Sequence, residues 1–312
     1  MTDTKQSDTP DLSWRSALAM GAVGLAGAAT LGVASAQSRG ASGMNPRPLA
    51  GQTAFITGAA RGIGAAVAEA MAEAGADVAA YDILEDIPGL NPMATTRRRV
   101  EAHGVRFMPI KGDIRDLAAQ RTAARDVERA FGRPIDILVA NAGVNTMANF
   151  TTEDDEAWET HWNMLTEINT LGTARTLRAV VPSMKARGRS RVILTASTFG
   201  RQGNAGNPGY VTSKWGHNGM IKSIALDVGE AGVTVNGVAP TAVRTGLGGP
   251  QTAEQRAQSD QWLDENYHAL DVGLTEPEQI APAYVFLAGP SGAMITGSII
   301  DVSAGAAARY TA

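Results

Sequence analysis

A tyrosine and a lysine four residues apart are the side chains of this sequence best placed to do chemistry together. Tyr210 and Lys214 stand in the segment Tyr-Val-Thr-Ser-Lys, which opens a predicted helix over residues 210–230. Residues i and i+4 share one face of a helix, so the phenol and the ammonium converge on one site. Ser197 ends a buried apolar run 13 residues earlier, at the carboxyl edge where open α/β sheets bind ligands. These three side chains predict an acid–base site.

A phenol needs help to act as a base near neutral pH, because a free tyrosine has a pKa of about 10. The ammonium of Lys214 favours the phenolate and so lowers the pKa of Tyr210, and an oxidised nicotinamide would act in the same direction. The structural alternative is a tyrosine that caps the helix beside a solvated lysine. A glycine pattern upstream favours the chemical interpretation.

That glycine pattern reads Thr57-Gly58-Ala59-Ala60-Arg61-Gly62-Ile63-Gly64. Its glycines permit a tight turn and let the backbone approach a pyrophosphate, whose charge then lies at a helix N-terminus. The turn follows a predicted strand, Thr53–Thr57, and opens a predicted helix, Gly62–Gly75. This is the context that a dinucleotide-binding turn requires.

Two side chains bear on which dinucleotide would bind. Asp82 ends the second predicted strand, about 20 residues beyond the turn, where a carboxylate hydrogen-bonds a ribose 2′-hydroxyl and repels a 2′-phosphate. Arg61 lies in the turn itself, where a guanidinium could instead bind that phosphate. We give Asp82 more weight, so the sequence favours NAD and leaves NADP as the alternative. The structural alternative for Asp82 is a carboxylate in a solvated loop.

Short β-branched runs alternate with longer helical patterns after Leu49. The predicted strands cover residues 53–57, 77–82, 105–110, 135–139, 191–195, 233–238 and 298–302. The predicted helices cover residues 62–75, 92–103, 115–131, 153–184 (one long helix or two abutting ones), 210–230 and 276–288. Repeated strand–helix–strand units predict an α/β fold: a single Rossmann-type, doubly wound parallel sheet with helices on both faces. We expect this domain to span residues 51–312.

Residues 1–36 resemble an export signal rather than part of this fold. The stretch Ser16–Ser38 carries no charge, Arg15 precedes it, and Ala34-Ser35-Ala36 matches a signal peptidase site. The segment around Arg15 is similar to a twin-arginine (Tat) motif in which Trp14 replaces the first arginine. We therefore expect export to the periplasm, with residues 37–50 as a linker. The alternatives are a retained leader in a cytoplasmic protein and a membrane anchor, which the glycines of the stretch disfavour.

Composition excludes several other classes of site. The chain of 312 residues has 27 Lys+Arg against 31 Asp+Glu, a net charge of −4, which argues against a dedicated nucleic-acid surface. It has no cysteine, which excludes disulfide scaffolds, thiolate metal sites and a cysteine nucleophile. Its 4 histidines include no i, i+4 pair, so we expect no metal site.

With these motifs in place, the sequence resembles the classical short-chain dehydrogenase/reductase family over nearly all of residues 52–307. The glycine turn matches the family's Thr-Gly-x-x-x-Gly-x-Gly, and Ala140-Asn141-Ala142-Gly143 matches its Asn-Asn-Ala-Gly except at the first position. Pro240-Thr241 stands where the family usually has Pro-Gly. Residues 238–243 and 275–280 are most similar to NAD-dependent carveol-type dehydrogenases, although the glycine turn lacks their Gly-Gln-Gly.

The resemblance implies a function: an NAD(P)-dependent oxidoreductase that interconverts a secondary alcohol and a ketone by hydride transfer, with Tyr210 as general acid/base. The implied catalytic residues are Asn169, which would anchor a proton-relay water, Ser197, Tyr210 and Lys214. The implied cofactor-binding residues are Gly58, Arg61, Gly62, Ile63, Gly64, Asp82, Asp113, Ile114, Asn141, Ala142, Gly143, Tyr210, Lys214, Pro240, Val243 and Thr245. The competing function is a nucleotide-binding regulatory protein of the same fold that has no catalytic activity.

Two further regions are expected to determine specificity and assembly. The polar segment 244–271 is expected to form a mobile substrate lid, in which Trp262 either packs within the lid or contacts the substrate. Residues 153–184 and 210–230 correspond to the family's usual subunit interface, which implies a homotetramer or homodimer. His217 is expected on the helix that joins this interface, and His268 at the surface. A small alcohol or ketone is the expected partner, with no nucleic acid and no stable membrane span.

Overall fold

The computed structural model describes residues 47–83, 92–147, 150–151, 154–247 and 252–309, all within one compact unit, Asn45–Ala312. The expected leader at residues 1–36 lies outside the described residues, as does most of the expected linker at 37–50. Residues 248–251 of the expected lid also lie outside them.

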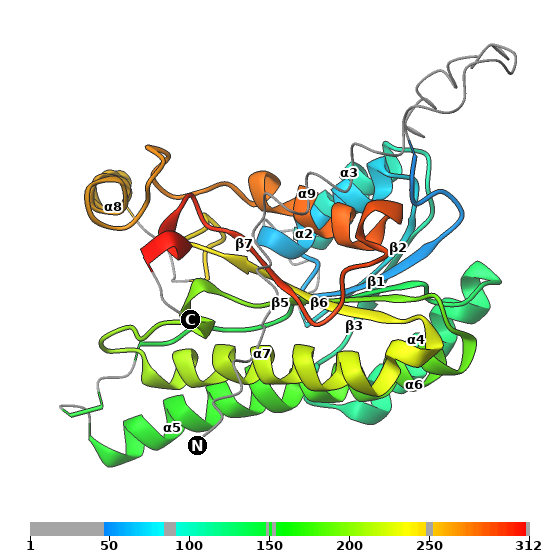
Figure 1. The fold of residues 1–312 in the computed structure, drawn as a ribbon, viewed down its shortest axis with the longest axis horizontal. Helices are drawn as coiled ribbons and strands as arrows, with labels where there is room; N and C mark the ends of the chain where they lie inside the picture. The colour runs from blue at the N-terminus through cyan, green and yellow to red at the C-terminus, as the bar shows by residue number, and fades with distance from the viewer. Residues whose placement is uncertain (1–46, 84–91, 148–149, 152–153, 248–251, 310–312) are drawn as a thin grey trace, which may run out of the picture. The chain divides into compact units, whose positions relative to one another are not determined.

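Seven parallel strands form one sheet in the order β3-β2-β1-β4-β5-β6-β7 (Figure 1). They are β1 (Thr53–Thr57), β2 (Asp77–Asp82), β3 (Phe107–Lys111), β4 (Ile137–Ala140), β5 (Arg191–Thr195), β6 (Thr234–Pro240) and β7 (Ile299–Val302). Every residue of β1, β2, β4 and β6 is buried, as expected for strands that are covered on both faces. The strand order reverses between β1 and β4, and open sheets bind ligands beyond the carboxyl ends of the strands at such a point.

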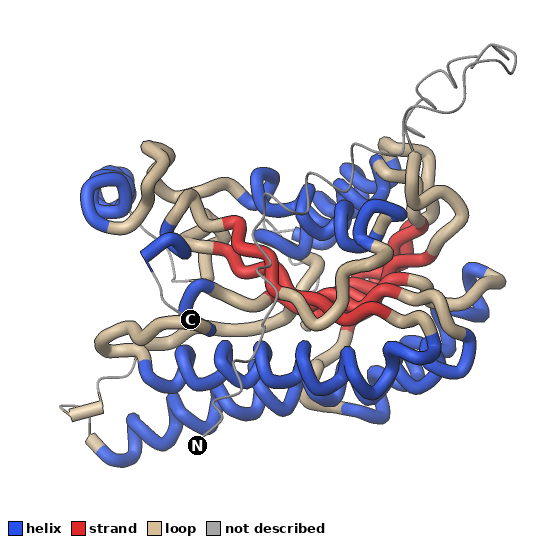
Figure 2. The backbone as a smooth tube through the Cα atoms, viewed as in Figure 1, coloured by secondary structure: helices blue, strands red, loops and turns tan. Residues whose placement is uncertain are grey.

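Helices cover both faces of this sheet, and Figure 2 shows the strands as a layer between them. On one face lie α2 (Gly62–Glu73), α3 (Pro92–Glu101) and α9 (Pro277–Ala288). On the other lie α4 (Leu117–Phe131), α6 (Thr173–Arg187) and α7 (Pro208–Val228). Each face has its own apolar core, with Met71 and Tyr284 in the first and Phe131 and Met184 in the second. The predicted doubly wound sheet is confirmed.

The region predicted as one or two helices at 153–184 is a continuous helical run with a π-helical turn inside it. Helix α5 (Asp155–Leu165) passes through the π turn η1 (Thr166–Gly172) into α6. Single π turns inside α-helices are frequent at functional positions. In this protein the turn carries the fully buried Asn169, one of the predicted catalytic residues.

The ends of the predicted elements differ from the observed ones by up to three residues, for local reasons. The helix predicted from Arg115 begins at Leu117, because Asp116 Oδ1 accepts a hydrogen bond from Ala119 N at 2.9 Å and caps the helix. The expected lid contains helix α8 (Ala253–Asn266). The remaining elements are the short turns η2 (Thr198–Gly200), η3 (Gly229–Ala231), η4 (Pro290–Gly292) and η5 (Ala306–Arg309).

A carboxylate at the start of β2 ties the amino-terminal edge of the sheet together. Asp77 Oδ2 accepts from Arg106 Nη2 at 2.7 Å and lies 3.4 Å from Arg133 Nη2, and its Oδ1 accepts from Arg106 N at 2.8 Å. Burial alone would raise the pKa of Asp77, but the hydrogen bonds and charges of the two arginines outweigh it and lower that pKa below 3.8.

We expect Asp77→Asn to lower the free energy of unfolding by about 1 kcal/mol at pH 7, because charge-assisted hydrogen bonds are lost. A depressed folded-state pKa stabilises the protein above the unfolded-state pKa, and this stabilisation disappears as the pH falls through the folded-state value. The difference between wild type and variant should therefore vanish in strong acid. Urea unfolding at several pH values measures this difference in stability. Asp126→Asn is the control, because Asp126 pairs with Arg129 at a more exposed position. An undiminished difference in acid would refute this assignment.

Candidate active site

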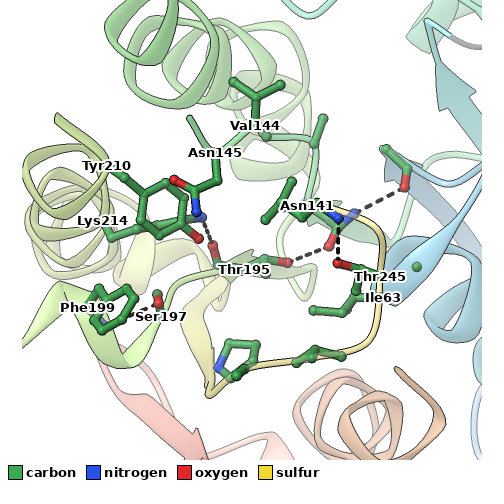
Figure 3. A pocket seen from close by; sticks show the side chains of 18 of the residues that line it. Ile63, Asn141, Val144, Asn145, Thr195, Ser197, Phe199, Tyr210, Lys214 and Thr245 are labelled. Carbon is green, nitrogen blue, oxygen red and sulfur yellow. Dashed lines mark hydrogen bonds between the residues drawn. The ribbon is translucent and has the colours of Figure 1, made fainter. Parts of the chain in front are cut away.

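A cavity of about 950 Å³ lies beyond the carboxyl ends of the central strands (Figure 3). It brings together 16 of the 18 predicted site residues: Gly58, Arg61, Gly62, Ile63, Asp82, Asp113, Ile114, Asn141, Ala142, Gly143, Ser197, Tyr210, Lys214, Pro240, Val243 and Thr245. The other two, Gly64 and Asn169, lie behind its wall and touch residues that line it. In Figure 3, Tyr210, Lys214 and Ser197 lie across the cavity from Ile63 and Thr245.

In the glycine turn, side chains in place of the glycines would be strained or would clash with the neighbouring backbone. Gly58 and Gly62 have φ angles of +66° and +57°, which favour glycine. A Cβ atom on Gly64 would lie 2.0 Å from the carbonyl oxygen of Gly58. Helix α2 begins within this segment, at Gly62, and its N-cap residue Arg61 makes no side-chain capping hydrogen bond. The turn therefore presents a close backbone approach and a helix N-terminus to an anion such as a pyrophosphate.

Three side chains join the ends of neighbouring strands β1, β4 and β5 beneath the cavity. Thr57 Oγ1 accepts from the backbone N–H groups of Asn141 and Ala142, both at 3.1 Å. The Asn141 amide donates to the carbonyls of Thr57 and Gly58 at 3.1 and 3.2 Å, and its oxygen accepts from Thr195 Oγ1 at 2.9 Å. The glycine turn is thereby connected to the strand that leads to Ser197.

The polar side chains at the ends of β2 and β3 lie where the sequence places them. Asp82 is buried and its Oδ2 accepts from Ala60 N at 2.9 Å, so this carboxylate braces the glycine turn. Arg61 is exposed at the cavity wall. The carboxylate of Asp113 pairs with Arg115 at 2.5 Å, and its backbone carbonyl accepts from Tyr81 OH at 3.0 Å.

Tyr210 and Lys214 lie on α7 with their side chains side by side. Lys214 Nζ is 5.5 Å from the centre of the Tyr210 ring and donates to the carbonyl of Thr195 at 2.9 Å. Burial lowers the pKa of Lys214 to about 7. Burial also raises the pKa of Tyr210 to about 12, and the Ser197 hydroxyl acts weakly in the opposite direction. The expected lowering of the Tyr210 pKa is therefore not seen in the protein chain alone.

Asn169 lies behind the predicted catalytic residues and orders the loop after β4. Its Oδ1 accepts from Val144 N, and its Nδ2 donates to Val144 O, both at 2.9 Å. The same Nδ2 also donates to Ser213 Oγ at 3.1 Å. The side chain of Asn169 thus connects the π turn, α7 and the cavity wall.

Two polar residues beneath the site were missed in the sequence. Thr195 ends β5 and contributes both its carbonyl and its hydroxyl, and its Oγ1 lies 2.7 Å from the OH of the buried Tyr284 on α9. Because the single Thr195 hydroxyl proton goes to Asn141, the Tyr284 phenol must donate to Thr195. A threonine two residues before Ser197, at the same sheet edge, was the available signal.

Aromatic side chains line the outer part of the cavity. Phe199 packs edge-on against Tyr210, with ring centres 6.4 Å apart, and Trp262 of the lid stacks on Tyr267 at 6.2 Å. The Tyr267 phenol donates to Thr198 Oγ1 at 3.1 Å and accepts from the Gln202 amide, so the end of α8 is tied to the loop after Ser197. Trp262 both packs within the lid and faces the cavity.

One histidine expectation is wrong. His217 lies on α7 as expected, and its side chain is buried inside the subunit, on the inward face of the helix three residues after Lys214. It is Trp215, on the outward face, that is exposed. His268, expected at the surface, is also buried, because the chain turns inward after α8 and Thr241 Oγ1 lies 2.7 Å from its Nε2.

Within the described ranges, no group of three or more His, Asp or Glu side chains is arranged to bind a metal ion. In the same residues, the helices fall short of the length and apolar character that a membrane span needs.

Known proteins resemble this chain. A family model for short chain dehydrogenases matches residues 52–256. An uncharacterised NAD-dependent oxidoreductase of Mycobacterium tuberculosis is 34% identical over 270 residues, which cover 83% of this chain and 96% of that protein. The chain belongs to the short-chain dehydrogenase/reductase family.

Solved structures agree with membership of the short-chain dehydrogenase/reductase family. The carveol dehydrogenase from Mycobacterium avium, in complex with NAD, is 30% identical with a TM-score of 0.74, over 84% of this chain and 99% of that one. A blue fluorescent protein from a metagenomic library, in complex with NADPH, is 30% identical with a TM-score of 0.72, over 83% and 99% of the two chains. The first structure agrees with the carveol-type similarity seen in the sequence.

We expect Gly64→Ala to weaken NADH binding by about tenfold or more, because the added Cβ would lie 2.0 Å from the Gly58 carbonyl and the turn must shift. Titration of NADH fluorescence measures the dissociation constant. Gly219→Ala on α7 is the control, since its Cβ would meet nothing within 4 Å. Equal affinities for wild type and Gly64→Ala would show that the turn does not contact the dinucleotide.

Proposed function

We propose that the protein is an NAD-dependent oxidoreductase that interconverts a secondary alcohol and its ketone by hydride transfer. The observation that carries this proposal is the position of Tyr210, Lys214 and Ser197 in the same cavity as the glycine turn. A dinucleotide seated on the turn and a substrate oxygen beside the phenol would then share one enclosed space. When bound, NAD supplies the hydride acceptor.

The chain's own groups would move one proton and orient two ligands. In the oxidation direction Tyr210 would accept the hydroxyl proton of the substrate, and Ser197 would hydrogen-bond the substrate oxygen. Lys214 would bind the nicotinamide ribose through its ammonium, which the Thr195 carbonyl orients at 2.9 Å. In the reduction direction Tyr210 would return the proton, and the buried phenol with its raised pKa is suited to that step.

Asp82 supports NAD rather than NADP as the cofactor. Its carboxylate is fixed at the end of β2 by the Ala60 N–H, in the wall of the cavity. A fixed negative charge there accepts a hydrogen bond from a ribose 2′-hydroxyl and repels a 2′-phosphate. The exposed side chain of Arg61 also lines the cavity and keeps NADP as the alternative.

The outer cavity supports a substrate with an apolar skeleton. Phe199, Leu247, Trp262 and Tyr267 line it, and the polar groups beside them include the amides Asn145 and Gln202 and the guanidinium of Arg256. A secondary alcohol on an apolar skeleton fits the aromatic part of this wall. A regulatory protein that binds NAD without turnover is the competing function, and the intact catalytic set argues against it.

We expect Tyr210→Phe to reduce kcat at least about 100-fold, because the group that accepts the proton is lost, while the dissociation constant for NADH changes only a few-fold. Initial rates with NAD⁺ and a panel of apolar secondary alcohols measure turnover. Tyr267→Phe is the matched control: it removes a phenol hydroxyl at the rim of the same cavity and should cost less than about tenfold. A Tyr210→Phe enzyme that keeps most of its activity would overturn the mechanism. A wild type that binds NADH but turns over none of the panel would favour the regulatory alternative.

We expect Asp82→Asn to raise the ratio of kcat/KM for NADP⁺ to that for NAD⁺ by about tenfold or more. Asparagine retains an oxygen for the Ala60 N–H and removes the charge that repels a 2′-phosphate. Parallel assays with the two cofactors give the ratio. Preference of the wild type for NADP⁺, or an unchanged ratio in the variant, would contradict the role of Asp82.

Three further proposals rest on the sequence. Residues 51–312 form the catalytic domain, residues 1–36 are a Tat-like leader that directs the protein to the periplasm, and the subunits assemble through the α5–α6 and α7 region. The exposed apolar side chains of Met164, Leu171 and Trp215 support the last of these.

A further inference from the structure

A buried histidine lies next to the proposed proton-transfer residues and has no part in the mechanism so far. His217 is on α7, three residues after Lys214 and seven after Tyr210, so all three side chains share one face of the helix. Only 1% of its surface is exposed. A buried imidazole needs partners for both ring nitrogens or it destabilises the fold.

Both ring nitrogens of His217 face backbone carbonyls. Nε2 lies 2.8 Å from the carbonyl oxygen of Asn169 in the π turn, and Nδ1 lies 3.1 Å from the carbonyl oxygen of Thr195 at the end of β5. The Thr195 carbonyl is the same oxygen that accepts from Lys214 Nζ at 2.9 Å. The imidazole thus bridges the π turn and the strand end, and it shares one acceptor with the catalytic lysine.

The number of protons on the ring decides what this bridge does. A neutral imidazole donates from one nitrogen only, and the shorter contact assigns that proton to Nε2 and the Asn169 carbonyl. Nδ1 then carries a lone pair and donates nothing to the Thr195 carbonyl, so Lys214 Nζ remains the donor to that oxygen. A second proton on Nδ1 would place two cations on a single carbonyl oxygen.

The charges around the pair favour one cation, not two. Burial and, after it, the charge of Lys214 lower the pKa of His217 to about 3, and the two carbonyls oppose this only in part. The other titratable groups nearby are Tyr210 on the same helix and Tyr284 on α9, which reaches the Thr195 hydroxyl. Among the described residues no carboxylate contributes to the pKa of either His217 or Lys214.

We propose that His217 is a positioning residue for Lys214: the neutral imidazole fixes the Asn169 carbonyl and leaves the Thr195 carbonyl to the ammonium, which keeps the site's positive charge on the lysine. Its consequence for turnover rests on the proposed function, because the charge of Lys214 matters to catalysis only if that residue works with Tyr210. The bridge itself can be tested without a cofactor or a substrate.

The first experiment is NMR of the full chain labelled with ¹⁵N-histidine, in wild type and in Lys214→Met. The His217 signals are assigned from their loss in His217→Gln. We expect wild-type His217 to stay neutral, with its proton on Nε2, down to about pH 5 or below. In Lys214→Met, which removes the competing cation, its titration midpoint should rise by at least about one pH unit. A wild-type ring that is already charged at pH 7, or identical titrations in the two proteins, would overturn the proposal.

The second experiment is the pH profile of kcat for wild type, His217→Leu and His217→Gln. Leucine replaces a polar imidazole near the buried ammonium by an apolar side chain, so Lys214 should lose its proton at lower pH and the alkaline limb should move down by about one pH unit. Glutamine can still donate to one carbonyl and should restore part of the wild-type profile. Ile221→Val, a buried apolar change one turn further along α7, should leave the profile unchanged.

The outcomes separate the two proposals. Histidine variants that fold and keep the wild-type profile would overturn the positioning role, whatever the NMR shows. If His217→Leu does not fold, the profile of His217→Gln decides. If the wild type turns over no alcohol, the proposed function fails, and the NMR comparison alone then decides whether His217 and Lys214 share one charge.

Discussion

The buried ammonium of Lys214 is the interaction on which the rest of the site depends. Removal of a cation from water costs roughly several kcal/mol unless acceptors replace the lost hydration. The fold supplies the Thr195 carbonyl at 2.9 Å, and burial still lowers the pKa of Lys214 to about 7. The protein chain therefore leaves this charge only partly stabilised. Oxygen atoms of a bound ligand can supply the acceptors that the ammonium lacks. Ligand binding and the charge of Lys214 are therefore expected to favour each other.

The sheet brings the partners of that charge together. Strands β1, β4 and β5 are neighbours because the chain crosses over after β3, and their carboxyl ends carry Thr57, Asn141 and Thr195. Hydrogen bonds between these three side chains join the glycine turn to the strand below Lys214. Tyr284 extends the network to α9 by donating to the Thr195 hydroxyl. A displacement of the glycine turn would thus be transmitted to Lys214 through short buried contacts rather than through loops.

The sequence alone predicted those features whose signal lies within a short segment of the chain. Alternation of apolar runs and helical patterns predicts each of the seven strands, and the glycine turn and the Tyr210–Lys214 spacing predict the cavity wall. Prediction failed where partners come from distant segments. The burial of His217 was not predicted because the sequence does not reveal which face of α7 turns inward, and the π turn and β5 that surround it lie far away along the chain. His268 is buried for a comparable reason, since its partner Thr241 follows β6.

The charge of Lys214 alone is not enough to lower the pKa of Tyr210 as the sequence led us to expect. Burial raises that pKa to about 12, and a lysine whose own pKa has fallen to about 7 carries too little charge at alkaline pH to reverse the effect. The protein alone therefore favours a protonated phenol, which suits proton donation to a ketone. Abstraction of a proton from an alcohol requires further positive charge in the cavity, and an oxidised nicotinamide carries one. Under the proposed function, the charge of the bound cofactor would select the direction in which Tyr210 transfers its proton, since the side chains alone favour only one of the two.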